Sequence, residues 1–191
     1  MDTKSGRDIS GDCSHETAVS TADLVGANRD LWDGWTELHV KSEFYDVEGF
    51  KAGRDTLDEV ELRGVLDRVS DMRGKTLLHL QCHFGLDTMS WARRGARATG
   101  VDFSEKAVTH ARHLARELSI PARFFQADVT DTSAVLAQLE GERFDVVFTS
   151  HGVINWLPDL RPWARTIAGA LKPGGTFLVV DSHPFSWMFD D

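Results

Sequence analysis

The sequence contains no apolar run that approaches the roughly 20 residues of a membrane span. Its amino terminus lacks the apolar core of a signal peptide. Cysteine is scarce: Cys13 lies in a polar leader and Cys82 at the end of an apolar run, so we expect no structural disulfide. These shortages together favour a cytoplasmic protein, for which free thiols and the absence of sorting segments are the rule.

Positive charge is also in short supply. Lys and Arg total 21 against 30 Asp and Glu, which gives a formal net charge of −9. A general nucleic-acid binder needs a basic stripe to displace counterions from phosphates, and this balance argues against one. The sequence also shows no recognition module. We therefore expect a small-molecule partner, and neither a nucleic acid nor a membrane.

The chain divides into three parts by composition and apolar pattern. Residues 1–22 are rich in Ser, Thr, Asp and Gly without an apolar period, which predicts a disordered leader. Residues 23–75 are predicted to form a helical amino-terminal cap or lid, and 76–191 an α/β core. Within the cap, Trp32, Trp35 and His39 share one helix face by their i, i+3, i+7 spacing. That face either packs on the core or closes over a ligand.

From residue 76 onward, apolar strand patterns alternate with amphipathic helix patterns. The predicted strands are 76–81, 96–103, 123–127, 144–150 and 176–181. The predicted helices between them are 87–94, 104–118, 133–139 and 160–171, with a further helix before the first strand at 57–69. Strands and helices at this spacing indicate right-handed βαβ units. The fold class is therefore α/β, with a doubly wound, mostly parallel sheet.

Ligands of such a sheet bind beyond the carboxyl ends of the strands. The second strand ends in Asp102, whose carboxylate can accept hydrogen bonds from both ribose hydroxyls of an adenosine cofactor, or can merely cap the helix beside Ser104. The loop after the first strand lacks the glycines of a dinucleotide fingerprint, because Gln81 and His83 stand where a pyrophosphate needs close backbone contact. S-adenosylmethionine has no phosphate, so the loop favours it over NAD.

Five segments match, in order, the motifs of a known family: 77–88 (LLHLQCHFGLDT), 100–104 (GVDFS), 127–129 (ADV), 144–148 (FDVVF) and 171–175 (LKPGG). The sequence resembles the class I S-adenosylmethionine-dependent methyltransferases, in a bacterial branch with a variant HLQCHFG first motif. The resemblance covers roughly 28–187. It implies a Rossmann-like methyltransferase fold with S-adenosylmethionine as the cofactor.

The resemblance also implies roles for individual residues. Asp102 would hold the ribose, and Phe103 would pack on the adenine face. Asp128, with Val129 alongside, would accept a hydrogen bond from the adenine amino group. The methionine arm would lie in the loop that contains Gln81, Cys82, His83 and Gly85.

The first motif departs from the common pattern of the family. Positions 79, 81 and 83 are usually acidic, Gly and Gly, whereas this sequence has His79, Gln81 and His83. Gly85 is the one glycine retained. These departures put the seat of the methionine arm in question.

At the end of the fourth strand, Ser150 and His151 would lie beside the sulfonium and the incoming acceptor. A base is needed only if the acceptor must lose a proton, and His151 and His183 are the candidates because both follow strand ends. Each could equally be structural. A lid over the cofactor would use aromatic faces, which attract the positive sulfonium, unless these residues are ordinary packing: Trp32, Trp35, Tyr45 and Trp156.

Class I methyltransferases usually continue beyond the fifth strand, and here that strand is predicted to be an apolar edge at 176–180, with the fold apparently truncated after it. Either the protein is longer, or a partner covers the edge, for example in a homodimer, or the chain is a degenerate fragment. The first hypothesis for function is methyl transfer to a small molecule. The alternative is a catalytically silent module that binds S-adenosylmethionine or dimerises. A nicotinamide-dependent oxidoreductase is a distant third.

Overall fold

The computed structural model describes residues 20–183, 185 and 188. Cys13 and the expected leader up to residue 19 lie outside them. Within the described part, Ser20 already caps the first helix, α1 (Thr21–Val40), through a reciprocal capping box with Asp23. The helical cap therefore begins two residues before the predicted boundary at residue 23.

Helices and strands alternate after the cap as the periodicity predicts. The helices after α1 are α2 (Val47–Lys51), α3 (Glu59–Val69), α4 (Leu86–Arg93), α5 (Glu105–Glu117), α6 (Thr132–Gln138) and α7 (Leu160–Ala170). The strands are β1 (Thr76–Leu80), β2 (Arg97–Asp102), β3 (Arg123–Gln126), β4 (Phe144–Ser150) and β5 (Leu171–Val180). One 3₁₀ turn, Ile154–Trp156, follows β4.

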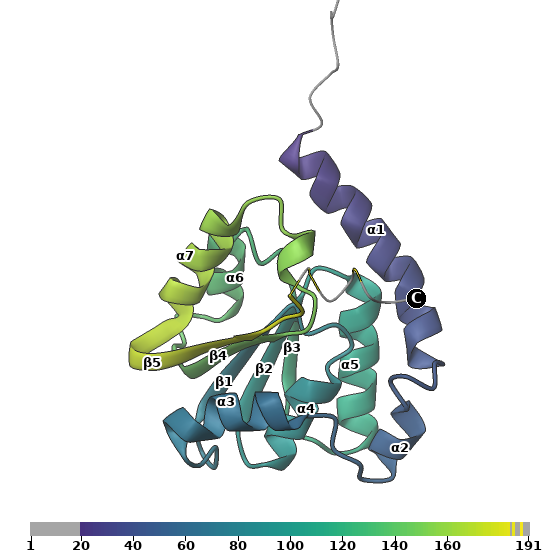
Figure 1. Cartoon of the computed structure of the whole chain (residues 1–191), viewed down its shortest axis with the longest axis vertical. Coiled ribbons are helices and arrows are strands. Elements are labelled where there is room, and N and C mark those ends of the chain that lie inside the picture. Colours follow the sequence, from purple (N-terminus) through teal and green to yellow (C-terminus); the bar gives the residue numbers. More distant parts are fainter. Residues whose placement is uncertain (1–19, 184, 186–187, 189–191) are drawn as a thin grey trace, which may run out of the picture.

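The five strands form one sheet in the order β3-β2-β1-β4-β5, and every neighbouring pair is parallel. In Figure 1, α6 and α7 lie on one face of this sheet, and α3, α4 and α5 on the other. The order reverses between β1 and β4, which is the switch point where open α/β sheets bind their ligands. The predicted doubly wound α/β fold is confirmed.

Alternate side chains of β1 enter two separate cores, as a strand buried on both faces requires. Leu77 packs with Trp91 of α4 on the α3 face, whereas Leu78 packs with Trp163 of α7 on the opposite face. Each of these four side chains is at most 6% exposed. Because both faces of β1 are buried, its sequence is mostly apolar and does not alternate between polar and apolar residues.

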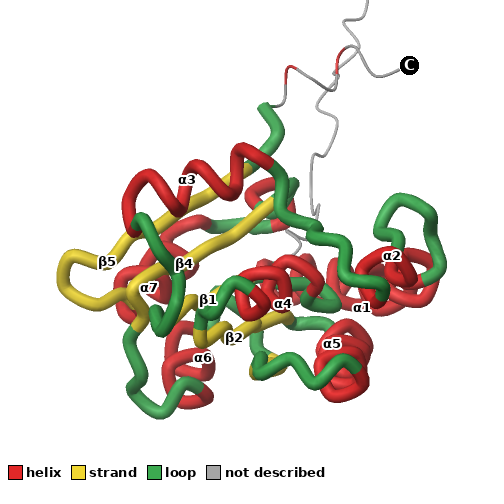
Figure 2. The backbone as a smooth tube through the Cα atoms, turned by 90° about the horizontal axis from the view of Figure 1, so that it is seen from below, coloured by secondary structure: helices red, strands yellow, loops and turns green. Residues whose placement is uncertain are grey.

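Strand β5 lies at one edge of the sheet, and α3 packs against it (Figure 2). The close approach depends on Gly64 of α3, since a Cβ atom there would meet the Leu178 side chain at 2.8 Å. Among the described residues, β5 pairs with β4 alone, and Val179 is 37% exposed. The apolar edge predicted from the sequence is present.

The start of β5 differs from the expectation. The sequence analysis predicts a helix at 160–171 and a strand at 176–181, but β5 already begins at Leu171. Leu171 pairs with Phe144 and Thr176 with Val146, so the Pro-Gly-Gly segment at 173–175 forms an irregularity inside the strand. Proline and glycine are tolerated there because bulges leave residues outside the ladder.

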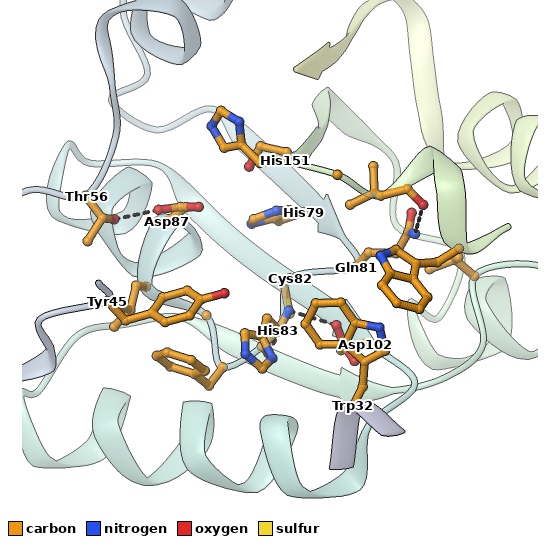
Figure 3. A pocket seen from close by; sticks show the side chains of 18 of the residues that line it. Trp32, Tyr45, Thr56, His79, Gln81, Cys82, His83, Asp87, Asp102 and His151 are labelled. Carbon is orange, nitrogen blue, oxygen red and sulfur yellow. Dashed lines mark hydrogen bonds between the residues drawn. The ribbon is translucent and has the colours of Figure 1, made fainter. Parts of the chain in front are cut away.

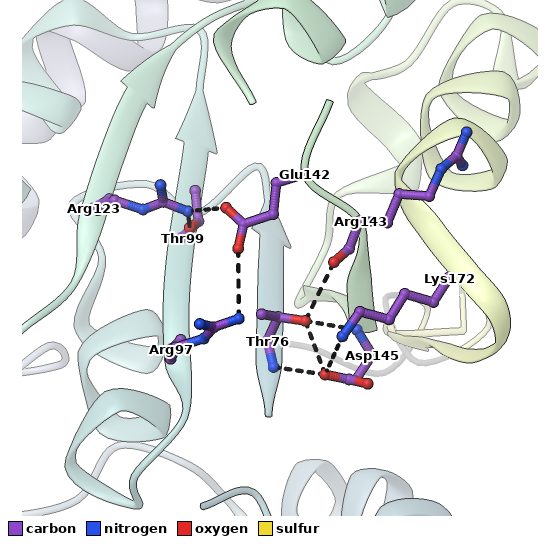
Figure 4. Close-up of polar contacts among 8 residues, drawn as sticks. All are labelled: Thr76, Arg97, Thr99, Arg123, Glu142, Arg143, Asp145 and Lys172. Carbon is purple, nitrogen blue, oxygen red and sulfur yellow. Dashed lines mark hydrogen bonds and ion pairs between the residues drawn. The ribbon is translucent and has the colours of Figure 1, made fainter. Parts of the chain in front are cut away.

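A polar network ties the amino ends of the strands together, opposite the ligand edge (Figure 4). Asp145 of β4 accepts hydrogen bonds from the Thr76 backbone N–H at 2.8 Å and from Lys172 Nζ at 2.9 Å. Burial alone would raise the pKa of Asp145, but these hydrogen bonds hold it at about 2. The network fixes β1, β4 and β5 to one another.

None of the helices in the described part of the chain is long and apolar enough to cross a membrane.

Candidate active site

The loop that follows β1 adopts a backbone that favours glycine. Gln81 has a φ of 58°, His83 of 49° and Gly85 of 81°. A left-handed conformation costs a residue with a side chain about 1–2 kcal/mol. Positions 81 and 83 are glycine in the common first motif of the family. Here they are Gln81 and His83, but their backbone still has the positive φ that glycine favours. Their side chains must therefore make contacts that offset this strain.

Both side chains do make such contacts. Gln81 Nε2 donates a hydrogen bond to the Val153 carbonyl at 3.3 Å, which ties the loop to the segment after β4. The His83 ring lies 4.5 Å from the Phe84 ring and 5.2 Å from that of Trp32, measured between centroids. Its Nε2 lies 3.0 Å from His39 Nδ1 of helix α1. The variant loop is therefore fastened by side chains at both ends.

Gly85 is required by close packing as well as by its φ. A Cβ atom at this position would lie 2.4 Å from the Phe124 ring of β3. Gly85 is also the N-cap of helix α4, and its left-handed backbone, which glycine adopts readily, lets the loop turn into the helix. The retained glycine thus fixes how closely the loop, α4 and β3 approach one another.

Asp102, at the carboxyl end of β2, lies directly beneath this loop. Its Oδ2 accepts a hydrogen bond from the His83 N–H at 2.8 Å, and its Oδ1 from the Ser104 N–H at 2.9 Å. The cap of α5 is Ser104, whose Oγ accepts from the Ala107 N–H. Asp102 is 6% exposed, and burial raises its pKa to about 6. It therefore joins loop and strand rather than capping the helix itself.

A pocket of about 420 Å³ opens at the carboxyl ends of the strands, within the range of small-molecule sites. All nine residues predicted to bind the cofactor line it: Gln81, Cys82, His83, Gly85, Asp102, Phe103, Asp128, Val129 and Ser150. Asp128 folds its Oδ1 back onto Thr130, which donates from its N–H and its hydroxyl. The structure thus gathers residues that are spread over four strand ends.

One side of the pocket is aromatic. We call Trp32, Tyr45, His83 and Trp156, all of which line the pocket, the aromatic wall. Figure 3 labels the first three of them. The ring of Trp32 lies 5.4 Å from that of Trp156, in an edge-to-face arrangement. Helix α1 is held there by Asn28, whose Nδ2 donates to the Trp156 carbonyl at 3.1 Å. The aromatic residues of the cap therefore lie over the pocket.

Two of the predicted residues lie away from the pocket lining. Trp35 packs on the rings of Trp32 and Trp156 from behind. His183 is exposed after β5, and its Nδ1 accepts from the Phe185 N–H at 3.2 Å. Neither is among the residues that line the pocket. Trp35 thus supports the aromatic wall, and His183 lies beyond it.

The opposite side of the pocket is acidic, and most of it was missed by the sequence analysis. We call Asp58, Glu61, Asp87 and His151 the acidic wall; all four line the pocket. His151 Nε2 lies 3.5 Å from both Asp58 Oδ2 and Glu61 Oε1. Asp87 Oδ1 accepts a hydrogen bond from Thr56 Oγ1 at 2.6 Å. In Figure 3, His79 lies beside Asp87 and below His151.

The two walls shift the pKa values of their histidines in opposite directions. Burial lowers the pKa of His83 to about 3 and also lowers the pKa of its neighbour His39. On the acidic wall, Glu61 raises the pKa of His151. Burial and the nearby Glu61 carboxylate raise the pKa of Asp87 to about 7. The aromatic wall is therefore neutral, and the acidic wall concentrates negative charge.

The comparison with known proteins agrees with this geometry. The family model described as "Methyltransferase domain" matches residues 78–179, more than half of the chain. The chain therefore belongs to the methyltransferase-domain family, as the motifs predict. The solved structure of a TehB-like SAM-dependent methyltransferase from Corynebacterium glutamicum is similar, with a TM-score of 0.58 at 19% identity, over 76% of this chain and 72% of the other. That likeness confirms the fold.

Two curated relatives carry the same name, ubiquinone biosynthesis O-methyltransferase. The protein from Proteus mirabilis is 29% identical over 150 residues, which cover 78% of this chain and 59% of the relative. The protein from Aeromonas salmonicida is 29% identical over 164 residues, which cover 85% and 67% respectively. The chain thus spans about three fifths of the length of the first of these relatives.

Proposed function

We propose that this chain transfers a methyl group from S-adenosylmethionine to a small-molecule acceptor. The observation that carries the proposal is the pocket of about 420 Å³ that the predicted cofactor residues line together, in a chain of the methyltransferase-domain family. Relatives named as O-methyltransferases of a small molecule support the reaction type. The net charge of −9 supports a small molecule over a nucleic acid.

The pocket suits the polar and cationic parts of this cofactor. Gln81 Oε1 and Ser150 Oγ are buried without a hydrogen-bond partner among the described residues, and both residues line the pocket. Buried polar atoms in native proteins are nearly always bonded, so their place here favours a polar ligand. The rings of Trp32 and Tyr45 would offer their faces to a positive sulfonium.

Asp102 would hold the ribose hydroxyls. Its two oxygens already accept from His83 and Ser104, but each carboxylate oxygen has a second lone pair. Those two hydrogen bonds also fix the orientation of the carboxylate before a ligand arrives, and a pKa of about 6 leaves it ionised at neutral pH. Asp128 and Phe103 would bind the adenine, and the loop at 81–85 the methionine arm.

S-adenosylmethionine supplies an activated methyl group, so the protein has mainly to position the acceptor in line with it. The contact with Glu61 raises the pKa of His151, which counts against this residue as a proton acceptor near neutral pH. His183 lies outside the pocket lining. We therefore assign the transfer to positioning by the two walls and place no general base at either histidine.

Two finer expectations belong to this proposal. The first is that the protein works in the cytoplasm, consistent with the lack of a membrane-spanning helix among the described residues. The second is a homodimer through the open edge of β5, where Val179 is 37% exposed. Exposed strand edges readily pair with a second strand, which supports this contact. Analytical ultracentrifugation would test it.

Calorimetric titration with S-adenosylmethionine tests the cofactor assignment. We expect micromolar binding to the wild-type chain, no binding of NAD, and loss of binding in Asp102→Ala. Because Asp102 is buried, Asp102→Asn serves as the milder second variant, and circular dichroism checks that both fold. Asp67→Ala, an exposed aspartate of α3, is the control and should bind normally. No binding to a folded wild-type chain would refute the proposal.

A screen of acceptors then separates an enzyme from a silent module. Turnover of bound S-adenosylmethionine with any small hydroxyl, amine or thiol acceptor supports methyl transfer. Tight cofactor binding with no turnover across all three acceptor types would support the alternative of a catalytically silent binding module.

A further inference from the structure

The acidic wall contains two carboxylates whose orientation is set by a helix cap. Asp58 is the N-cap of α3, and its Oδ1 accepts from the Glu61 N–H at 2.8 Å. Glu61 Oε2 in turn accepts from the Asp58 N–H at 2.8 Å. This reciprocal capping box uses one oxygen of each carboxylate. The second oxygen of each, Asp58 Oδ2 and Glu61 Oε1, is left facing His151.

The three remaining atoms have the spacing of a metal ligand set. His151 Nε2 lies 3.5 Å from Asp58 Oδ2 and 3.5 Å from Glu61 Oε1, and all three ligand atoms lie within 4.8 Å of one another. Ligands bound to Zn²⁺ at about 2.0–2.1 Å in a tetrahedron are roughly 3.4 Å apart. An ion can therefore be accommodated with little movement of side chains.

Buried atoms without partners point to a ligand at this place. The Glu61 side chain is 2% exposed, yet its Oε1 accepts no hydrogen bond from any described residue. His79, itself 2% exposed, uses Nδ1 to bond Thr88 Oγ1 at 2.9 Å, and its Nε2 has no hydrogen-bond partner in the part of the chain that the structure describes. His79 lines the same pocket as Glu61. Leaving a buried polar atom unpaired is costly, so each marks a site for a missing partner.

The electrostatics of the wall favour a cation rather than an anion. Three carboxyl groups, those of Asp58, Glu61 and Asp87, line the same side of the pocket. Arg54 also lines the pocket, but its guanidinium pairs with Asp46 at 2.8 Å. The Arg54 guanidinium is therefore directed to Asp46 rather than to the carboxylates of this wall.

We propose that Asp58, Glu61 and His151 bind a divalent transition-metal ion such as Zn²⁺. One imidazole with two carboxylates suits such an ion better than Mg²⁺ or Ca²⁺, which prefer oxygen ligands alone. The capping box holds both carboxylates in place from behind, as hydrogen-bonded supports do in known metal sites. Three protein ligands leave a coordination position open, as in catalytic rather than structural sites.

The open position would face the pocket, because all three ligands line it. A metal ion there would bind an acceptor oxygen and lower the pKa of the hydroxyl, so that the hydroxyl would release its proton to water without a protein base. This role, though not the metal site itself, rests on the proposed methyl transfer. It would make an acceptor with a metal-binding hydroxyl the preferred substrate class.

Zn²⁺ titration of the full chain against a chromophoric chelator, without S-adenosylmethionine, tests the site. We expect one ion bound, with Mg²⁺ unable to compete. His151→Ala and Glu61→Gln should each weaken binding by at least about 10-fold, since even outer supports of metal ligands are worth that much. Gln at position 61 can still accept from the Asp58 N–H, which protects the helix cap.

His113→Ala is the matched control. His113 also lies near a carboxylate, with its Nδ1 3.8 Å from Glu117 Oε2, but on the exposed surface of α5. This variant should bind Zn²⁺ as the wild type does. Absence of Zn²⁺ binding, or binding that survives both His151→Ala and Glu61→Gln, would overturn the metal site. Because cofactor is left out, this result is independent of the S-adenosylmethionine titration.

Discussion

The two walls of the pocket treat the same residue type in opposite ways. His83 in the aromatic wall is surrounded by rings, and burial keeps it neutral with a pKa of about 3. His151 in the acidic wall stands 3.5 Å from two carboxylate oxygens, and its pKa is raised. Histidine has an ordinary pKa of about 6.5, so small differences in surroundings decide its charge near neutrality.

Under the proposed function, the two sides of the cavity would have different roles. An uncharged, aromatic surface suits the flat and cationic parts of a cofactor. A negative surface with an imidazole suits a cation or a hydroxyl that must lose its proton. The loop at 81–85 contributes to the aromatic wall and leads directly into α4, which supplies Asp87 to the acidic wall.

Disrupting the loop between the walls should have the largest effect. In Gly85→Ala the new Cβ would lie 2.4 Å from the Phe124 ring, and we expect a loss of roughly 2–4 kcal/mol in the free energy of unfolding. Gly141→Ala is the control, because Gly141 has a similar φ of 77° but no atom within 4 Å of the added Cβ. It should lose only about 1 kcal/mol. Equal losses in urea unfolding would show that steric contact is unimportant.

Removing the neutral histidine should change the response to acid. The unfolded chain binds a proton at His83 below pH 6.5, whereas the folded protein does so only near pH 3. The stability from His83 is thus complete above pH 6.5 and is lost as the pH falls toward 3. Between pH 7 and pH 4, we expect the free energy of unfolding of His83→Gly to fall by less than that of the wild type, and the difference should be on the order of 2 kcal/mol.

Thermal unfolding at pH 7 and pH 4 measures this difference. His113→Gly would be a poor control because it would break α5, so His113→Gln, at an exposed histidine, is preferable. That variant should keep the acid response of the wild type. An unchanged response in His83→Gly would contradict a neutral His83.

The acidic wall should give the opposite pH dependence. Asp87 loses its proton near pH 3.8 in the unfolded chain but near pH 7 in the folded protein. Its contribution to stability therefore falls as the pH rises from about 4 to 7. Asp87→Asn removes this penalty, so the free energy of unfolding of the variant relative to the wild type should be greater at pH 8 than at pH 5, on the order of 1–2 kcal/mol. Thermal unfolding at the two pH values would show it as a larger gain in Tm at pH 8. Asp67→Asn should show no such trend.

Weakening the contact between helix α1 of the amino-terminal segment and helix α5 should have the smallest effect. Ser104 Oγ donates a hydrogen bond of 2.5 Å to Asp33 Oδ1, which joins α1 to the start of α5. Asp33→Asn keeps an acceptor but loses its charge, so we expect a loss of about 0.5–1 kcal/mol in unfolding free energy. Urea unfolding measures it. A loss as large as that of Gly85→Ala would mean that the cap, and not the loop, organises the aromatic wall.

Much of the fold could be predicted from local patterns. The strand at 144–150 was predicted at its observed bounds, and the helix at 104–118 differs from α5 only because Ser104 is the cap and Leu118 the last flanking residue. The predicted start of β5 was wrong, because the pairing of β5 with β4 begins at Leu171, before the Pro-Gly-Gly segment. Pairing between strands is a long-range property that periodicity does not record.

The candidate site was only half predictable. The loop at 81–85 and Asp102 were expected from motif spacing, and both line the pocket. Asp58 and Glu61 carry a readable sequence signal, the D-x-x-E capping box before an apolar run. That signal predicts the start of a helix and nothing about a ligand. Their second oxygens gain meaning only because His151, at the far end of β4, lies opposite them.

The sequence by itself determined the order of strands and helices along the chain, the parallel sheet, the family and the position of the loop after β1, because each depends on local periodicity or on motifs in chain order. Only the tertiary structure decided which side chains share a wall, and which histidine has a raised pKa and which a lowered one. His39 and His83 lie 44 residues apart in the chain and 3.0 Å apart in space. Burial and charge act through space, so the chemistry of each wall follows from the packing of distant segments.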